Sequence, residues 1–156
     1  MEDIYAKPGY LFRRAQQIAV AIFAEECAPF DVTPVQYAAL VAIREHPGVD
    51  ATRLSALVAF DRSTLGSVIE RIEAKGLVAR SASPADKRIK LLSLTPAGRA
   101  LVKAILPSVE RAQERMLGPL GPADRRILLG LLGQLVATNN EVSRAPLRPG
   151  LERRSA

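Results

Sequence analysis

The sequence predicts a mainly α-helical fold with one small β-hairpin. Apolar residues recur at helical spacing over most of the chain, and two short stretches near the middle lose that period. Aromatic residues make up only 4% of the 156 residues, so Leu, Ile, Val and Ala must build the core, which favours packed helices. Hydrophobic residues make up 48% and charged residues 24%, the balance of a globular domain, and the length suits one such domain.

The first third of the chain predicts two helices. Residues 9–27 carry a long apolar stripe at helical spacing, which indicates an amphipathic helix. Thr33 then supplies an N-cap and Pro34 suits the first helical position, so a second helix is expected to run to about Glu45. The His-Pro-Gly sequence at 46–48 ends it.

Two shorter helices joined by a tight turn follow. The first is expected over residues 51–58, and Asp61 is a good N-cap for the second, which carries an apolar stripe as far as Lys75. Gly76 lies where a helix end favours a left-handed residue. Together these features predict a helix-turn-helix with residues 61–75 as its second helix.

The apolar period then changes. Residues 77–80 and 89–94 are typical of two strands, and the polar stretch 81–88 joins them as a small wing.

The remaining sequence predicts two more helices and a tail. Thr95 and Pro96 repeat the cap-plus-proline opening, which predicts a long helix to about Met116 with a kink at Pro107. A last helix is expected over residues 123–138. One domain should therefore occupy residues 1–140, and residues 141–156, rich in proline and arginine, are expected to be disordered.

The hairpin and its flanks resemble the wing signature of the MarR family. A helix closes on Lys-Gly, a strand follows, a D-x-R turn lies at residues 86–88, and a second strand ending in Leu-Thr precedes a helix with glycine in its first turn. The resemblance covers roughly residues 9–139. It implies a winged helix-turn-helix lobe at 32–96 and dimerisation helices at 9–28 and 97–139.

Charge and the resemblance together favour duplex DNA as a partner. The net charge is +6, and residues 52–103 carry 10 basic and 4 acidic groups, whereas residues 1–51 carry 4 and 7. A basic segment of this kind is typical of a surface that faces a polyanion, although a solvated surface would tolerate the same bias.

Candidate DNA contacts lie on the second helix of the helix-turn-helix and on the wing. Small polar and basic side chains near a helix N-terminus suit the major groove, and basic groups farther along suit phosphates. The resemblance implies that Arg88 enters the minor groove, braced by Asp86 through a charge-assisted pair. A solvated helix face and hairpin are the alternative. The candidates are Arg62, Ser63, Thr64, Ser67, Arg71, Lys75, Asp86, Lys87, Arg88 and Lys90.

The segments 8–17 and 31–37 resemble MarR-type regulators of aromatic-acid catabolism, of the benzoate- or nicotinate-responsive kind. That resemblance implies a pocket between the dimerisation helices and the DNA-binding lobe. An aromatic carboxylate there would require an arginine and aromatic walls. The candidate effector residues are Phe12, Arg13, Arg14, Phe30 and Tyr37, for each of which a core or surface role is the alternative.

The sequence therefore predicts a homodimeric, sequence-specific transcriptional repressor, released from a pseudo-palindromic operator by a small aromatic acid or related metabolite. Two alternatives stay open: a redox-sensing repressor that uses Cys27, and a non-specific architectural DNA-binding protein. One His and one Cys, with no metal-ligand spacing, phosphate loop or nucleophile elbow, argue against an enzyme and against a metal or cofactor. Without a signal peptide or a long apolar run, we expect a cytoplasmic protein rather than a membrane protein.

Overall fold

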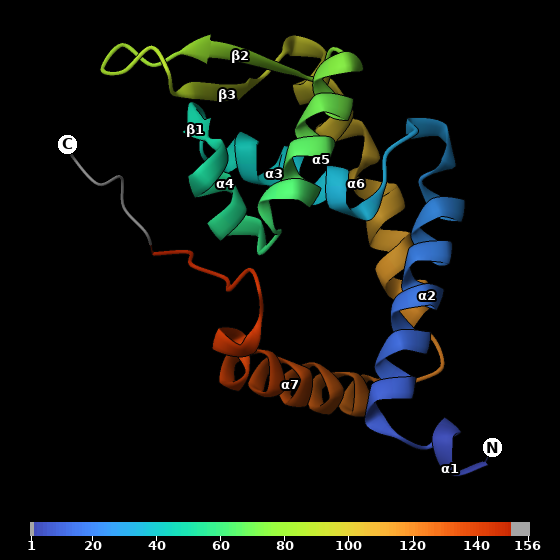
Figure 1. The fold of residues 1–156 in the computed structure, drawn as a ribbon. Helices are drawn as coiled ribbons and strands as arrows, with labels where there is room; N and C mark the ends of the chain where they lie inside the picture. Colours follow the sequence, from blue (N-terminus) through green and yellow to red (C-terminus); the bar gives the residue numbers. More distant parts are fainter. Residues whose placement is uncertain (1, 151–156) are drawn as a thin grey trace.

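Seven α-helices and a three-stranded antiparallel sheet make up residues 2–150, the part of the chain that this computed structural model describes (Figure 1). The elements in chain order are α1 (Glu2–Tyr5), α2 (Pro8–Glu26), η1 (Ala28–Phe30), α3 (Pro34–Glu45), β1 (Val49–Asp50), α4 (Ala51–Val58), α5 (Arg62–Ala74), β2 (Val78–Ala82), β3 (Lys90–Leu94), α6 (Pro96–Leu117), α7 (Pro122–Thr138) and η2 (Asn140–Val142). The predicted fold, mainly helical with a small hairpin, is confirmed.

Helices α3, α4 and α5 and the sheet enclose the hydrophobic core, which the first half of α6 closes. Its largest fully buried side chains include Leu40 and Ile43 of α3, Leu54 of α4, Leu65 and Ile72 of α5, Leu92 of β3, and Val102 and Ile105 of α6. Complete burial of a side chain of this size contributes about 1.5–3 kcal/mol relative to exposure. This shared core fixes α5 against the rest of the lobe.

Each of the three lobe helices begins at a side-chain cap. Thr33 Oγ1 accepts a hydrogen bond from the Gln36 amide, and the Gln36 side chain accepts one from the Thr33 amide, which makes a capping box. Asp50 accepts from an amide of α4, and Asp61 accepts from the third amide of α5. The predicted caps Thr33 and Asp61 are therefore confirmed, and each contributes about 1 kcal/mol.

Helix α5 ends in a Schellman motif at Gly76, which has φ +70°. The Gly76 amide donates to the carbonyl of Glu73 at 2.8 Å, and the Leu77 amide donates to the carbonyl of Ile72 at 3.0 Å. Glycine is favoured here because it has no Cβ to resist the left-handed conformation. The predicted C-cap residue is confirmed, and it sets the direction in which β2 leaves α5.

The sheet has the order β1-β3-β2, with β3 in the centre. β2 and β3 form the hairpin, and β1 adds a short third strand through the pairs Val49↔Leu92 and Asp50↔Leu91. The sequence does not predict β1, because a two-residue strand is too short to show an alternating pattern. The wing is thereby attached to the chain that precedes α4.

The first turn of α6 packs directly on the end of the α5–β2 turn. Thr95 caps α6 by accepting from the Gly98 amide at 3.0 Å, and its hydroxyl donates to the carbonyl of Gly76 at 2.6 Å. A Cβ on Gly98 would lie 2.1 Å from the carbonyl oxygen of Leu77. The glycine in the wing signature is therefore required by a backbone-to-backbone contact.

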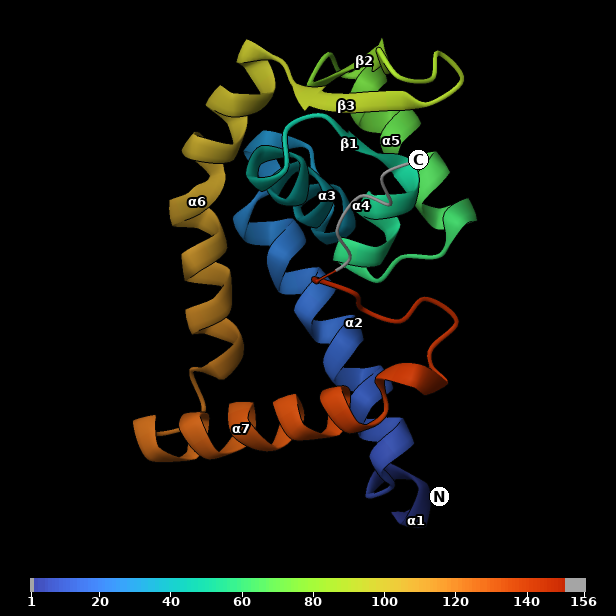
Figure 2. The ribbon, with the colours of Figure 1, turned by 90° about the vertical axis from the view of Figure 1, so that its left-hand side faces the viewer.

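Outside the lobe, α2 packs beside α6, and α7 extends away from the end of α6 (Figure 2). We call these three helices the frame. Ion pairs join α2 to α6, with Arg115 Nη2 2.7 Å from Glu25 Oε2 and Arg111 Nε 3.2 Å from Glu26 Oε2. Helix α6 continues as one helix through Pro107, where the sequence predicts a kink. Helix α7 runs across the lower end of the frame in both views.

The tail, for which the sequence predicts disorder from residue 141, makes defined contacts over the residues that the structure describes. Residues 140–142 form η2, and the chain then turns back to hydrogen-bond with α4 as far as Pro149. Residues 151–156 of the same prediction lie outside the described residues. Among residues 2–150, none of the helices has the length and apolar character needed to cross a membrane.

Candidate nucleic-acid interface

Helices α4 and α5 form the predicted helix-turn-helix. The turn passes through Ala59, whose φ of 53° is left-handed, and it is closed by hydrogen bonds from Phe60 N to Ser55 O at 3.3 Å and from Ser55 Oγ to Phe60 O at 2.5 Å. Helix α5 buries four apolar side chains in the core, and it leaves its other face in solvent. A helix held in this way can enter a major groove without unfolding any part of the lobe.

The first turn of α5 carries exposed polar side chains. Ser63 Oγ donates to Asp61 Oδ1 at 2.6 Å, and Thr64 Oγ1 donates to Asp61 Oδ2 at 2.7 Å. These hydroxyl bonds and the Thr64 amide hold the pKa of Asp61 well below its usual range. In this arrangement both hydroxyl oxygens still accept hydrogen bonds, so they suit the amino groups of bases better than phosphate oxygens.

The basic side chains of α5 differ in whether they are already paired. Lys75 Nζ forms an ion pair with Asp31 Oδ2 at 2.8 Å and also donates to the Asp31 carbonyl. The side chains of Arg62 and Arg71 make no hydrogen bond or ion pair with any residue of the described range. Two of the three N–H groups of Lys75 Nζ are therefore already engaged with Asp31, whereas the guanidinium groups of the two arginines are fully available.

The loop between β2 and β3 presents Arg88 to solvent. Its Nε donates to Asp86 Oδ1 at 3.0 Å and its Nη2 to Asp86 Oδ2 at 2.9 Å, while the side chain stays 91% exposed. This pairing lowers the pKa of Asp86 and raises the pKa of Arg88. Lys87 and Lys90 are exposed beside it. The Asp86–Arg88 brace is present as expected, and it leaves the Nη1 group of Arg88 free to donate.

A cavity of about 320 Å³ lies between α2, the start of α3 and α5. Gln16 and Val20 line it from α2, and Thr64, Ser67 and Arg71 line it from α5. The last three also belong to the predicted DNA-reading set. A molecule in this cavity would therefore contact the same helix face that the sequence assigns to DNA.

Three of the five predicted effector residues lie together on α2. Phe12, Arg13 and Arg14 are all exposed. The Arg13 guanidinium lies 5.0 Å from the centre of the Tyr10 ring, and Arg14 Nη1 donates to Gln17 Oε1 at 2.9 Å. None of the three lines the cavity beside α5.

The other two predicted effector residues pack against the core. Phe30 and Tyr37 are partly buried, and the Tyr37 ring lies 6.1 Å from the ring of Phe23. Neither lines the cavity beside α5. The sequence does not indicate Gln16 or Val20 as cavity residues, because a helical period shows which face is apolar but not which neighbour it meets.

Cys27 is buried, with 1% of its surface exposed. Burial raises the pKa of its thiol, and the charge of Glu26 raises it further. An oxidation sensor needs an accessible thiolate, and this environment favours the opposite state. The described residues also contain no group of three or more His, Cys, Asp or Glu side chains placed to hold a metal ion.

Comparison with known proteins assigns this fold to one family. Residues 30–89 match the model of the MarR family. The HTH-type transcriptional repressor NicR of Pseudomonas putida is 31% identical over 134 residues, which cover 86% of this chain and 85% of NicR.

Two solved structures extend the similarity to the three-dimensional fold. BpsR of Bordetella bronchiseptica, studied for regulation of its DNA binding by 6-hydroxynicotinic acid, is 37% identical with a TM-score of 0.79, over 84% of this chain and 94% of BpsR. The repressor CouR bound to a 23-mer DNA duplex is 30% identical with a TM-score of 0.77, over 83% of this chain and 92% of CouR. CouR is also known bound to p-coumaroyl-CoA. The chain is therefore a winged helix-turn-helix, DNA-binding transcriptional regulator that belongs to the MarR family.

Proposed function

We propose that this regulator is a homodimeric, sequence-specific repressor that leaves a pseudo-palindromic operator when a small aromatic acid or related metabolite binds. One observation carries the proposal. Thr64, Ser67 and Arg71 belong both to the predicted DNA-reading face of α5 and to the wall of the cavity beside it. A ligand in that cavity would compete with DNA for the same side chains. It would therefore bind the free protein more tightly than the DNA-bound protein, and this difference in affinity is what releases the DNA.

The apolar surface of α7 supports a second copy as partner. None of the 17 residues of this helix is buried. Its exposed apolar side chains are Ile127, Leu129, Leu131, Leu135 and Val136, with exposures of 49–64%. A surface of this kind is typical of an interface, and a two-fold axis would cover it with the same surface of another copy.

A duplex selected from a random pool should be pseudo-palindromic, with half-sites about 10 bp apart, because a two-fold dimer presents two α5 helices to successive major grooves. Repeated rounds of selection followed by footprinting measure this directly, and sedimentation gives the oligomeric state. A monomer at micromolar concentration, or a footprint without two-fold symmetry, contradicts the proposal. A pool that never converges supports the architectural alternative.

Arg88→Ala should weaken binding to the selected operator by about 1–3 kcal/mol, because it removes a groove contact. Thermal unfolding should not change, since the side chain is 91% exposed. Lys87→Ala is the matched control, and it should lower affinity for all duplexes alike and flatten the salt dependence by about one counterion per protomer. Fluorescence anisotropy at several salt concentrations measures both effects. Wild-type affinity in the Arg88 variant would remove the wing from the mechanism.

The chemistry of the cavity and of the relatives' ligands supports an aromatic carboxylate. The DNA binding of BpsR is regulated by 6-hydroxynicotinic acid, an aromatic carboxylic acid, and CouR binds p-coumaroyl-CoA, the coenzyme A thioester of another aromatic acid. Here Arg71 can pair with a carboxylate, while Val20 and Val68 offer apolar contacts to a ring. The volume of about 320 Å³ suits a single-ring acid. Once paired with the acid, Arg71 is no longer available to phosphate.

A thermal-shift screen of aromatic acids and their coenzyme A thioesters tests this assignment without DNA. A true effector at about 100 times its Kd should stabilise the protein by about 2.7 kcal/mol and dissociate the operator complex. Arg71→Ala should abolish the shift, whereas loss of the shift in Arg14→Ala would favour the predicted group of Phe12, Arg13 and Arg14. If no acid binds and peroxide releases DNA in a Cys27-dependent manner, the redox alternative replaces this one.

A further inference from the structure

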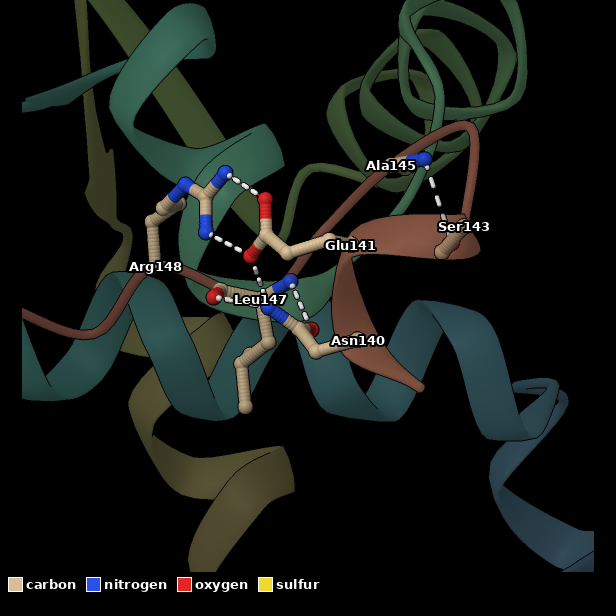
Figure 3. Close-up of polar contacts among 6 residues, drawn as sticks. All are labelled: Asn140, Glu141, Ser143, Ala145, Leu147 and Arg148. Atoms are coloured by element: carbon tan, nitrogen blue, oxygen red, sulfur yellow. Dashed lines mark hydrogen bonds and ion pairs between the residues drawn. The ribbon is translucent and has the colours of Figure 1, made fainter. Parts of the chain in front are cut away.

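Side chains of η2 hold the segment that follows it in the chain (Figure 3). Asn140 Nδ2 donates to the Leu147 carbonyl at 3.2 Å, and the Leu147 amide donates to Asn140 Oδ1 at 2.8 Å. Arg148 forms a two-bonded ion pair with Glu141, with Nη2 donating to Oε2 at 2.6 Å and Nη1 donating to Oε1. We call residues 143–150 the strap. These contacts fold the strap back on η2.

The strap is also attached to α4, the first helix of the helix-turn-helix. Arg53 Nη1 donates to the Arg148 carbonyl at 2.9 Å, and Arg53 Nη2 donates to the Pro149 carbonyl at 2.6 Å. The Arg148 amide donates to the carbonyl of Ala56 at 2.8 Å. The strap continues from η2 through the chain at residue 143, and hydrogen bonds hold it again at residues 147–149. The residues in between, Arg144 among them, therefore lie in a closed loop and have already lost much of their conformational freedom.

A cavity of about 350 Å³ lies between the strap and the helix-turn-helix. Thr52 and Ser55 line it from α4, Asp61 and Arg62 line it at the start of α5, and Arg144 lines it from the strap. The Arg62 and Arg144 side chains make no hydrogen bond or ion pair with any other described residue, in contrast to Arg53 and Arg148. Asp61 is already used by its capping bonds. Two available guanidinium groups therefore border one cavity.

We propose that Arg144 is a DNA-phosphate contact and that the strap positions it beside Arg62. The inference rests on the proposed docking of α5 in the major groove. When the first turn of α5 enters a groove, the phosphates along that groove pass its N-terminal end. A phosphate there can accept from both guanidinium groups, and such charge-assisted contacts position a protein without reading sequence. Arg144 would thus extend the interface beyond the helix and wing.

Arg144→Ala in the whole 156-residue chain tests the contact. We expect about tenfold weaker binding to the selected operator and to a random duplex alike, because a charged hydrogen bond without sequence information is lost. The salt dependence should flatten by about one counterion per protomer. Arg44→Ala is the matched control, since it removes the same charge from an exposed side chain on α3 that pairs with Glu45.

Asn140→Ala tests the role of the strap without changing any charge. It removes both bonds to Leu147, so it should reproduce part of the Arg144→Ala loss. The double variant should bind no more weakly than Arg144→Ala alone, because Asn140 acts only by positioning Arg144 and its loss has no effect once Arg144 is absent. The inference is overturned if Arg144→Ala loses no more affinity than Arg44→Ala, or if its salt dependence equals that of the wild type. Operator selection by the wild-type protein tests the proposed function separately from this comparison.

Discussion

Gly98→Ala is expected to destabilise the protein by about 3 kcal/mol, because the added methyl carbon would lie 2.1 Å from the carbonyl oxygen of Leu77. Neither side of this contact can move freely. The Leu77 carbonyl accepts from the Thr95 amide at 3.0 Å, and the Gly98 amide donates to Thr95 Oγ1 at 3.0 Å. Relief of the clash must therefore break the cap of α6 or shift the end of α5. In a chain of this size we expect the melting temperature to fall by about 6–12 °C.

Gly66→Ala is the matched control, and its effect should have the opposite sign. Gly66 lies inside α5, and a Cβ there would meet no atom within 4 Å. Alanine has the better helix propensity, so this variant should gain about 0.5–1 kcal/mol. Urea denaturation followed by circular dichroism measures both variants. Wild-type stability in Gly98→Ala would contradict the assignment of Gly98 to a backbone contact.

Leu131→Glu is expected to convert the protein to a monomer and to weaken operator binding by about 100-fold or more. The side chain is 55% exposed in the single chain, so the fold of each protomer should persist. In the proposed dimer a carboxylate at this position would lose its water without gaining a partner, which costs several kcal/mol. A monomer engages one half-site only, and the gain from linking two half-sites is then lost.

Sedimentation velocity and operator titration of the same sample separate the two consequences of Leu131→Glu. Gln134→Glu adds the same charge to α7 at a position that is already polar and exposed, so it should leave the dimer intact. If Leu131→Glu remains a dimer with wild-type affinity, then α7 is not the dimerisation helix and its apolar face needs another partner.

The parts of the fold that could be predicted depend on local chemistry. Thr33 and Asp61 cap helices because a hydroxyl or carboxylate reaches the free amides of its own first turn, and Gly76 ends α5 because it accepts a left-handed conformation. Strand β1 could not be predicted in the same way. Its two residues become a strand only by pairing with β3, a partner about 40 residues away in sequence.

The same distinction, between features within one element and features that depend on how elements pack, applies to the candidate site. The polar face of α5 follows from spacing within one helix, the Asp86–Arg88 brace was implied by the resemblance of the wing, and both are present. The cavity beside Arg71 depends on how α2 and α3 meet α5, which no single stretch of sequence states. The strap was missed because composition indicates only that a segment lacks a core of its own. Its attachment uses hydrogen bonds between Arg53 and residues 95 and 96 positions later.

The junction at Thr95 has a mechanical consequence. Its amide, its hydroxyl and the Gly98 contact attach α6 to Leu77 and Gly76, so α5, the wing and the start of α6 form one rigid block. A hinge cannot lie at this junction. A rotation of α6 would then move α5 and the wing together as one rigid unit. In the proposed dimer this would change the distance between the two α5 helices, while the arrangement of helix and wing within each protomer stays the same.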